Sequence, residues 1–378
     1  MTNPLNLSSP TDMSGFYMVY RYDGTQEHDG TYGITHLMEH LMCKSFDDLC
    51  DQLDADGIKW NACTYNDYVV FYWRGLDRYV SKWKNVLYRR MLEFKVTRYE
   101  LDIERKIVLE EYQDNFDDPS IAHSYNMWRK YFGQYGPLGQ RESIKKIRLV
   151  DCKQFFNTYC QNPHVINVSK HSEFSDDMLM PGIVEWPTGG LEYRNGKGKN
   201  MTFEKRNFER EKTSVIFHSL IVEPEDGAVV KFICDVLSKG LNSPFYQELR
   251  EKRGLIYGME CCVETLNANG SILISTDTFN ANADEVVRVL CGILDNLPEY
   301  ITKDRCDLML NKYAVREEMH SAERYKHVTR FIEAPNWDVF NAMLVGNVFT
   351  YENIMRVAEK YFKTQDFFIS KDSDEVWQ

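Results

Sequence analysis

The chain has 378 residues, which is more than one typical hydrophobic core accommodates and suggests two domains of about two hundred residues or fewer each. Charged residues make up 27% of the chain and aromatic residues 13%, a balance typical of globular proteins and not of disordered or fibrous ones. The formal net charge is −12 and no segment is rich in Lys or Arg, so nucleic acid is a poor candidate for a partner.

The cysteines and the N-terminus indicate the compartment. The ten cysteines form no CxxC pair, and several lie inside apolar runs such as KFICDVL, so we expect reduced, mostly buried thiols. The first residues, MTNPLNLSSPTDM, lack the basic start and apolar core of a signal peptide, and no apolar run approaches the length of a membrane span. We therefore predict a cytoplasmic protein without a membrane partner.

The first half of the chain alternates between strand-like and helix-like segments. Aromatic and β-branched residues predict strands over residues 15–22, 67–75 and 163–170. Between the first two lies GITHLMEHLM, residues 33–42, which has the periodicity of an amphipathic helix. Thr97 followed three residues later by Glu100 is a capping box, which predicts a helix from about residue 98 to residue 113.

A stretch dense in glycine and proline, MPGIVEWPTGGLEYRNGKGKN, follows the third strand and is expected to hold a domain linker. The second half repeats the alternation, with strands predicted at 214–222, 255–265 and 271–279 and helices at 227–240 and 283–297. We therefore expect two α/β-type domains, residues 1–175 and 201–378, joined by a linker over 176–200.

The predicted helix at residues 33–42 has two different faces. One side collects Ile34, Leu37, Met38 and Leu41, and nearly the opposite side presents His36, Glu39 and His40. Histidines four residues apart can reach one cation with two ring nitrogens, and Zn²⁺ is the usual ion for imidazole plus carboxylate. The alternative is a solvated polar face, but the full H-x-x-E-H pattern is much rarer by chance than a single His–Glu pair.

A catalytic zinc usually takes three protein ligands, so another donor must come from elsewhere in the chain. On the helix after Thr97, Glu104 and Glu111 lie two turns apart on nearly one line in an apolar sector, whereas Glu110 points away from it. Burying an ionised carboxylate alone is costly, and ligation of a cation would offset that cost. We predict Glu111 as the third ligand, Glu104 as its supporting neighbour and Glu110 as a surface residue; the alternative is an acid-rich surface helix.

Three stretches together, GITHLMEHLMCK, WNACTYNDYVVFYW and ERKIVLEEYQDNFDDP, resemble the N-terminal domain of the pitrilysin/insulysin family of zinc peptidases, the inverzincins. In that family the H-x-x-E-H helix and a glutamate about seventy residues later hold the zinc, a spacing that His40 and Glu111 match. The segment LSKGLNSPFYQELREKRGLIYG is similar to the second-domain signature of the two-domain members, which include mitochondrial processing peptidase and small bacterial relatives. The resemblance implies an α+β fold of two similar domains, each a mostly antiparallel sheet covered by helices, enclosing a cleft.

The second of these segments also has a local prediction of its own. Ser243 is placed as a helix N-cap, Pro244 at the first helical position and Gly254 as the stop, with a strand beginning at Leu255. This puts Arg250 on the helix and Tyr257 on the strand.

The resemblance gives functional roles to further residues. It implies that Arg250 and Tyr257 face the zinc across the cleft and bind the substrate backbone and the oxyanion; without it, a surface arginine and a core tyrosine are equally good readings. It also implies that Asn61 and Ala62 lie on an edge strand that pairs with extended substrate. The strand that usually precedes GFYMVYRY in the family is expected to be missing.

These observations lead to the hypothesis of a zinc metalloendopeptidase that cuts peptides or unfolded segments in a chamber between two domains. One Zn²⁺ per chain on His36, His40 and Glu111 would acidify water, and Glu39 would take the proton. The alternatives are a non-catalytic binding or assembly subunit of the same fold and a structural zinc closed by a fourth ligand such as Cys43. A homodimer or a pairing with a related chain is expected from the family.

Overall fold

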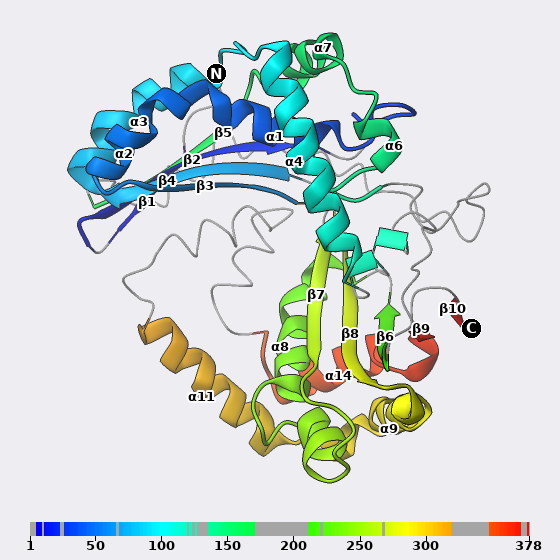
Figure 1. Cartoon of the computed structure of the whole chain (residues 1–378). Coiled ribbons are helices and arrows are strands. Elements are labelled where there is room, and N and C mark those ends of the chain that lie inside the picture. The colour runs from blue at the N-terminus through cyan, green and yellow to red at the C-terminus, as the bar shows by residue number, and fades with distance from the viewer. Residues whose placement is uncertain are drawn as a thin grey trace. The chain divides into compact units, whose positions relative to one another are not determined.

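The computed structural model of the chain describes residues 5–9, 11–22, 26–65, 68–118, 121–122, 125–126, 135–170, 211–219, 222–266, 269–319, 348–371 and 376–377. They fall into two compact units, of which the first contains strands β1 to β5 and the second β6 to β10 (Figure 1). The predicted linker at 176–200 lies outside the described residues. The described part of the chain contains no helix that is long and apolar enough to cross a membrane. The cytoplasmic location stays a prediction.

The first unit is built on a five-stranded sheet with the order β1-β5-β2-β4-β3. Its strands are β1 (Leu5–Ser8), β2 (Met13–Arg21), β3 (Lys59–Thr64), β4 (Tyr68–Leu76) and β5 (His164–Ser169). All neighbours are antiparallel except β1 and β5, which are parallel. The strands predicted near residues 15–22, 67–75 and 163–170 are confirmed.

The expectation that no strand precedes β2 is wrong. Residues Leu5–Ser8 form β1, whose four residues pair in parallel with Ile166 to Ser169 of β5. The segment LNLS alternates leucine with polar residues, as a strand does, but over only four residues this signal is weak. The segment becomes a strand because β5 offers an unpaired edge with which its backbone can form hydrogen bonds.

The helices around the first sheet are α1 (Ile34–Cys43), η1 (Lys44–Leu49), α2 (Cys50–Ala55), α3 (Asp77–Met91), α4 (Arg98–Phe116), α6 (Arg141–Ile144) and α7 (Leu149–Tyr159). Helices α1 and α3 pack on this sheet, and the remaining helices of the unit lie around them. Figure 1 shows α1 and α3 on the same face of the sheet. The capping box predicted for α4 is present, because the Thr97 N–H donates to Glu100 Oε2 (2.7 Å) and the Glu100 N–H donates to Thr97 Oγ1 (3.2 Å).

The second unit repeats this plan with a sheet of order β10-β9-β6-β8-β7, in which all neighbouring strands are antiparallel. Its strands are β6 (Lys212–Ser219), β7 (Glu260–Leu266), β8 (Asn269–Phe279), β9 (Phe367–Lys371) and β10 (Val376–Trp377). The main helices are α8 (Gly227–Ser238), α9 (Ala283–Leu294), α10 (Leu297–Tyr300), α11 (Lys303–Met319) and α14 (Tyr351–Tyr361). The α+β fold with two mostly antiparallel sheets is thus confirmed, whereas the cleft between the domains stays a prediction.

One local prediction in the second unit is wrong. The strand expected from Leu255 begins only at Glu260. The carbonyl groups of Leu255 and Gly258 accept hydrogen bonds from the Thr278 and Thr276 hydroxyls, both at 2.7 Å, so side chains of β8 take the place of its backbone there. The N-cap position predicted for Ser243 is confirmed, because the helix begins at Pro244 and the Gln247 N–H donates to the Ser243 carbonyl oxygen at 2.9 Å. The Ser243 hydroxyl group itself is buried without a hydrogen-bond partner among the described residues.

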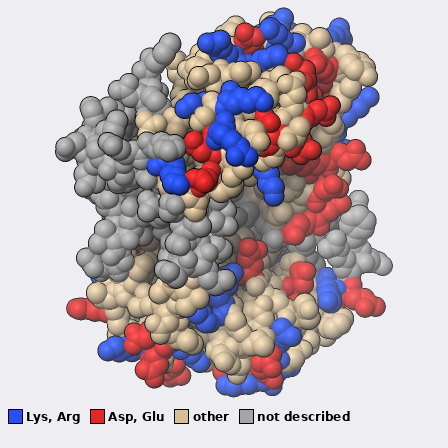
Figure 2. Space-filling model, turned by 90° about the vertical axis from the view of Figure 1, so that its left-hand side faces the viewer, with Lys and Arg blue, Asp and Glu red and all other residues tan. Residues whose placement is uncertain are grey.

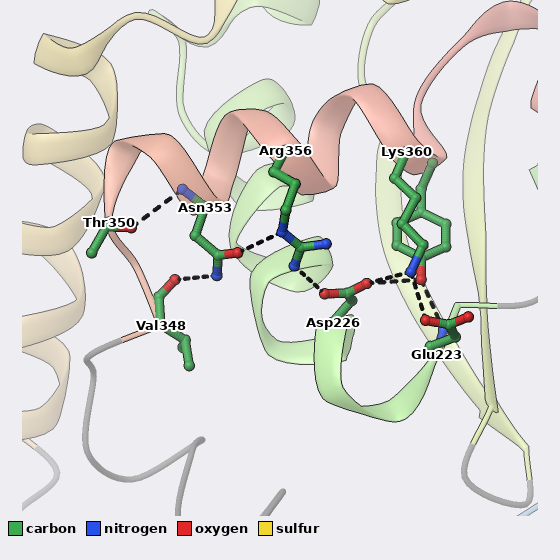
Figure 3. Close-up of polar contacts among 8 residues, drawn as sticks. Glu223, Asp226, Val348, Thr350, Asn353, Arg356 and Lys360 are labelled. Carbon is green, nitrogen blue, oxygen red and sulfur yellow. Dashed lines mark hydrogen bonds and ion pairs between the residues drawn. The ribbon is translucent and has the colours of Figure 1, made fainter.

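A polar cluster joins the start of α8 to α14 (Figure 3). Asp226 is 3% exposed, and its carboxylate accepts hydrogen bonds from Arg356 Nη2 (2.6 Å), Lys360 Nζ (2.9 Å) and Tyr361 Oη (2.9 Å). Lys360 Nζ also bonds Glu223 Oε2 at 2.6 Å. A buried carboxylate is tolerated because three donors replace its water.

On the face that Figure 2 shows, the Lys and Arg side chains of the described residues are interspersed with those of Asp and Glu.

Candidate metal centre

Helix α1 carries the two histidines of the H-x-x-E-H pattern. Its apolar residues are buried as predicted, with Ile34, Leu37, Met38 and Leu41 at most 1% exposed. His36 is also buried, at 5% exposed, while Glu39 and His40 are partly exposed. The imidazole rings of His36 and His40 lie 4.9 Å apart and nearly perpendicular, at 81°. The helical repeat therefore brings both rings to one place beside the buried face.

Glu111 of α4 meets these two rings. Its Oε2 lies 3.5 Å from His36 Nε2 and 3.4 Å from His40 Nε2. The ligand atoms of His36, His40 and Glu111 all lie within 4.8 Å of one another. Two donors at about 2.1 Å from a common ion, separated by a tetrahedral angle, are about 3.4 Å apart. Two imidazoles and a carboxylate at these separations fit a zinc ion in both chemistry and spacing.

Glu104 contacts His40 on the side of the ring away from Glu111. It is 4% exposed, and its Oε2 lies 3.1 Å from His40 Nδ1. Lys44 Nζ contacts the other oxygen, Oε1, at 3.0 Å and so neutralises the buried charge. The arrangement holds the His40 ring with Nε2 directed to Glu111. Glu110 is exposed on α4, as the sequence predicted.

The protonation of the group follows from its surroundings. Burial lowers the pKa of His36 to about 4, against the opposing pull of Glu111, so this imidazole is neutral near pH 7 and has a lone pair for a cation. Burial also lowers the pKa of His40, but Glu111, Glu39 and Glu104 outweigh it and raise the pKa overall. The hydrogen bond with His40 lowers the pKa of Glu111 despite partial burial.

Glu39 stands on the same helix outside the converging set. Its Oε2 accepts a hydrogen bond from Thr64 Oγ1 of β3 at 2.6 Å. Burial raises the pKa of Glu39, and the bond from Thr64 opposes that shift. A carboxylate with a raised pKa beside a cation site is the usual form of a proton-transfer group.

No fourth His, Cys, Asp or Glu joins the three within the part of the chain that the structure describes. Cys43, the residue considered for closing a structural site, is not a member, and burial raises the pKa of its thiol. Three protein ligands are typical of a catalytic zinc, which keeps one position for water or substrate.

Sequence reasoning missed two residues of this centre. Lys44 lies one helical turn after His40, so its spacing was a usable signal. Thr64 gave no signal, because its contact with Glu39 joins β3 to α1 and depends on how the strand packs.

Asn61 and Ala62 both lie on β3, at the edge of the first sheet. Within the second unit, Arg250 stands on the π-helical turn η4 (Tyr246–Glu251), and its guanidinium carbon lies 5.2 Å from the centre of the Tyr257 ring. Tyr257 is in the loop before β7 and is 84% exposed, which excludes its alternative reading as a core residue. The structure thus places Arg250 and Tyr257 side by side, while their role at the metal centre stays a prediction.

The fold and the centre define a two-unit α+β protein with an inverted H-x-x-E-H metal motif. The family model "Insulinase (Peptidase family M16)" matches residues 10–131, and the model "Peptidase M16 inactive domain" matches residues 180–313. The chain belongs to this pitrilysin-type family, M16, as the sequence resemblance indicated.

Known relatives agree with this assignment. An uncharacterized zinc protease of Mycobacterium leprae is 22% identical over 295 residues, which cover 72% of this chain and 66% of that protein. An uncharacterized zinc protease of Bacillus subtilis is 25% identical over 264 residues, which cover 64% of this chain and 63% of that protein. The chain thus spans about two thirds of the length of these relatives. The crystal structure of a protease from Helicobacter pylori shares the fold, with a TM-score of 0.75 at 18% identity over 98% of both chains.

Proposed function

We propose that the chain is a zinc-dependent metalloendopeptidase that hydrolyses peptides or unfolded protein segments bound in an extended form. The observation that carries the proposal is the convergence of His36, His40 and Glu111, with Glu39 beside them on the same helix. The curated relatives named as zinc proteases support the same chemistry.

The proposed mechanism gives the metal ligands, Glu39 and Thr64 different roles in hydrolysis. Zinc bound by His36, His40 and Glu111 would supply a Lewis acid that acidifies water and polarises the substrate carbonyl. Glu39 accepts the proton of the attacking water and later delivers it to the leaving amine, a role that its raised pKa suits. Thr64 holds one oxygen of Glu39 in place through its hydroxyl group.

Substrate binding is proposed at the edge of the first sheet. Among the described residues β3 pairs with β4 alone, so the other side of β3, including Asn61 and Ala62, has backbone groups for an added strand. Pairing of this kind uses the backbone of the peptide and tolerates many sequences. Arg250 and Tyr257 are proposed, from the family likeness, to bind the substrate backbone and the oxyanion.

The test is Glu39→Gln with Glu110→Gln, the exposed acid on α4, as its matched control. Zinc content would be measured by metal analysis, and cleavage with a library of unstructured peptides. Glu39→Gln should keep one zinc per chain and lose turnover by about 10²- to 10⁴-fold, since a proton-transfer group contributes that much. Glu110→Gln should match the wild type. Retained cleavage by Glu39→Gln would refute the role of Glu39.

A non-catalytic binding or assembly subunit is the second candidate, because the model that matches residues 180–313 is described as an inactive domain. Wild-type protein that holds zinc and binds peptides but cleaves none of the library would favour it. Pairing with a second copy or a related chain stays a prediction.

A further inference from the structure

The N-terminus of α1 is held by an acidic residue outside the H-x-x-E-H pattern. Glu27 Oε2 accepts a hydrogen bond from the Gly33 N–H at 2.9 Å, and its Oε1 accepts one from the Thr35 N–H at 3.0 Å. Helix α1 begins at Ile34 after Gly33, which has no side chain with which to cap it. The Glu27 carboxylate therefore supplies the cap from six residues earlier in the chain.

The turn that joins Glu27 to α1 has little freedom to adjust. Gly33 has φ +97°, a left-handed backbone conformation that favours glycine. Gly139 packs against it so closely that a Cβ on Gly139 would lie 2.1 Å from the Gly33 Cα. A Cβ on Gly33 would in turn lie 2.8 Å from a side-chain carbon of Ile144. The start of α1 therefore packs closely against the loop that contains Gly139 and is bound by the Glu27 carboxylate.

The charge of Glu27 has a local function. Burial raises the pKa of this carboxyl group, while the hydrogen bonds from Thr35 and Gly33 lower it. An anion at a helix N-terminus interacts favourably with the N–H groups there and with the helix dipole, which offsets the loss of water. Thr35 directly precedes His36, so one of these two bonds is made at the residue adjacent to the first histidine of the metal centre.

We infer that Glu27 is a positioning residue for the metal centre: its carboxylate fixes the start of α1 and thereby the placement of His36 and His40 relative to Glu111. The inference rests on the proposed zinc site. Ligand atoms must be held within about 0.5 Å of the productive geometry. A helix whose first turn shifts or frays does not hold its side chains to that precision. Glu27 is not one of the three converging side chains, and its bonds to Gly33 and Thr35 act through the backbone of α1.

The test compares Glu27→Gln with Asp151→Asn. Asp151 is an acidic cap in the same unit, since the Arg148 N–H donates to its Oδ2 at 2.8 Å at the start of α7, and it lies outside the metal centre. Gln keeps the size of Glu27 but leaves one oxygen for two N–H donors. Zinc affinity would be measured by competition with a chelator, ligand geometry by the visible spectrum of the Co²⁺-substituted protein, and helix opening by hydrogen exchange over α1 in metal-free protein.

Glu27→Gln should bind zinc about tenfold more weakly, change the Co²⁺ spectrum and exchange the first turn of α1 faster, since partners that orient metal ligands contribute at least that much to affinity. Asp151→Asn should lose thermal stability but keep the wild-type zinc affinity and spectrum. Glu27→Asp, which restores the charge with a shorter reach, should fall between Gln and wild type, and it replaces Gln if that variant does not fold.

Two outcomes separate this inference from the proposed function. If Glu27→Gln loses thermal stability as Asp151→Asn does but keeps wild-type zinc affinity and the wild-type Co²⁺ spectrum, Glu27 is an ordinary helix cap and the inference is overturned. If wild-type protein binds zinc without cleaving peptides, the proposed endopeptidase activity fails, while the zinc and Co²⁺ measurements still decide the role of Glu27. Wild-type protein that binds neither metal would overturn both.

Discussion

Removal of Glu104 should weaken zinc binding although all three proposed ligands stay in place. Its carboxylate joins His40 Nδ1 at 3.1 Å to Lys44 Nζ at 3.0 Å and is almost entirely buried. Partners that orient a metal-bound imidazole contribute about 10- to 100-fold to metal affinity, or about 1.4 to 2.7 kcal/mol. Glu104→Gln keeps one oxygen for His40 and turns its NH₂ group toward Lys44, so the ion pair is lost, and we expect about a tenfold loss. Glu104→Leu removes both contacts, and we expect about a hundredfold loss.

The assay is a competition titration of zinc against a chromophoric chelator at constant pH and ionic strength, with Glu110→Gln as the exposed control on the same helix. Lys44→Met adds a second check. Because Lys44 reaches His40 through Glu104, the double variant Glu104→Leu/Lys44→Met should bind zinc no more weakly than Glu104→Leu alone. A Glu104→Leu variant whose zinc affinity stays within about twofold of wild type would contradict the reasoning, since the orientation of His40 would then have another source.

Three further predictions concern stability and turnover. Burial would raise the pKa of Asp226, but its bonds to Arg356, Lys360 and Tyr361 lower that pKa overall. The charged Asp226 therefore stabilises the fold at a pH above the ordinary aspartate pKa, and this stabilisation is lost as the pH falls through the lower pKa of the folded state. Asp226→Asn should therefore lower the unfolding free energy by about 2 kcal/mol at pH 7, and urea titrations should show the difference from wild type shrinking below about pH 4. Gly139→Ala, which collides with Gly33, should cost about 3 kcal/mol or more, whereas Gly30→Ala, with φ +91° and open space around it, should cost about 1 to 2 kcal/mol; equal shifts in Tm would contradict this. Tyr257→Phe should reduce kcat about 10²-fold with unchanged zinc affinity if its hydroxyl group binds the oxyanion, and an unchanged kcat would remove it from the mechanism.

Much of the metal centre was predictable because its information is local. Two histidines four residues apart meet on any α-helix, and the Thr97–Glu100 capping box sets the phase of α4, so Glu104 and Glu111 fall on one line. The same periodicity identified the buried face of α1. Residues that act from another element could not be found in this way. Glu27 reaches α1 through a turn with a left-handed glycine, and Thr64 reaches Glu39 from a strand.

The errors have the same cause. The short β1 is a strand because β5 offers it a partner, and Leu255 to Met259 stay outside β7 because threonine hydroxyls of β8 bond the backbone there. In both places a distant segment decided the backbone hydrogen bonding, and the local sequence carried at most a weak signal of it.

The amino-acid sequence by itself determined the family, the α+β class and the set of side chains that could bind a cation, because helical periodicity and motif spacing depend on residues within a few turns of one another. Only the tertiary structure decided that Glu111 comes within 3.5 Å of both histidines, that Lys44 neutralises Glu104 and that Glu27 caps α1. These contacts join residues far apart in the chain or across a turn. Their distances follow from where the fold places α1 and α4 and the loops beside them, which no local pattern specifies.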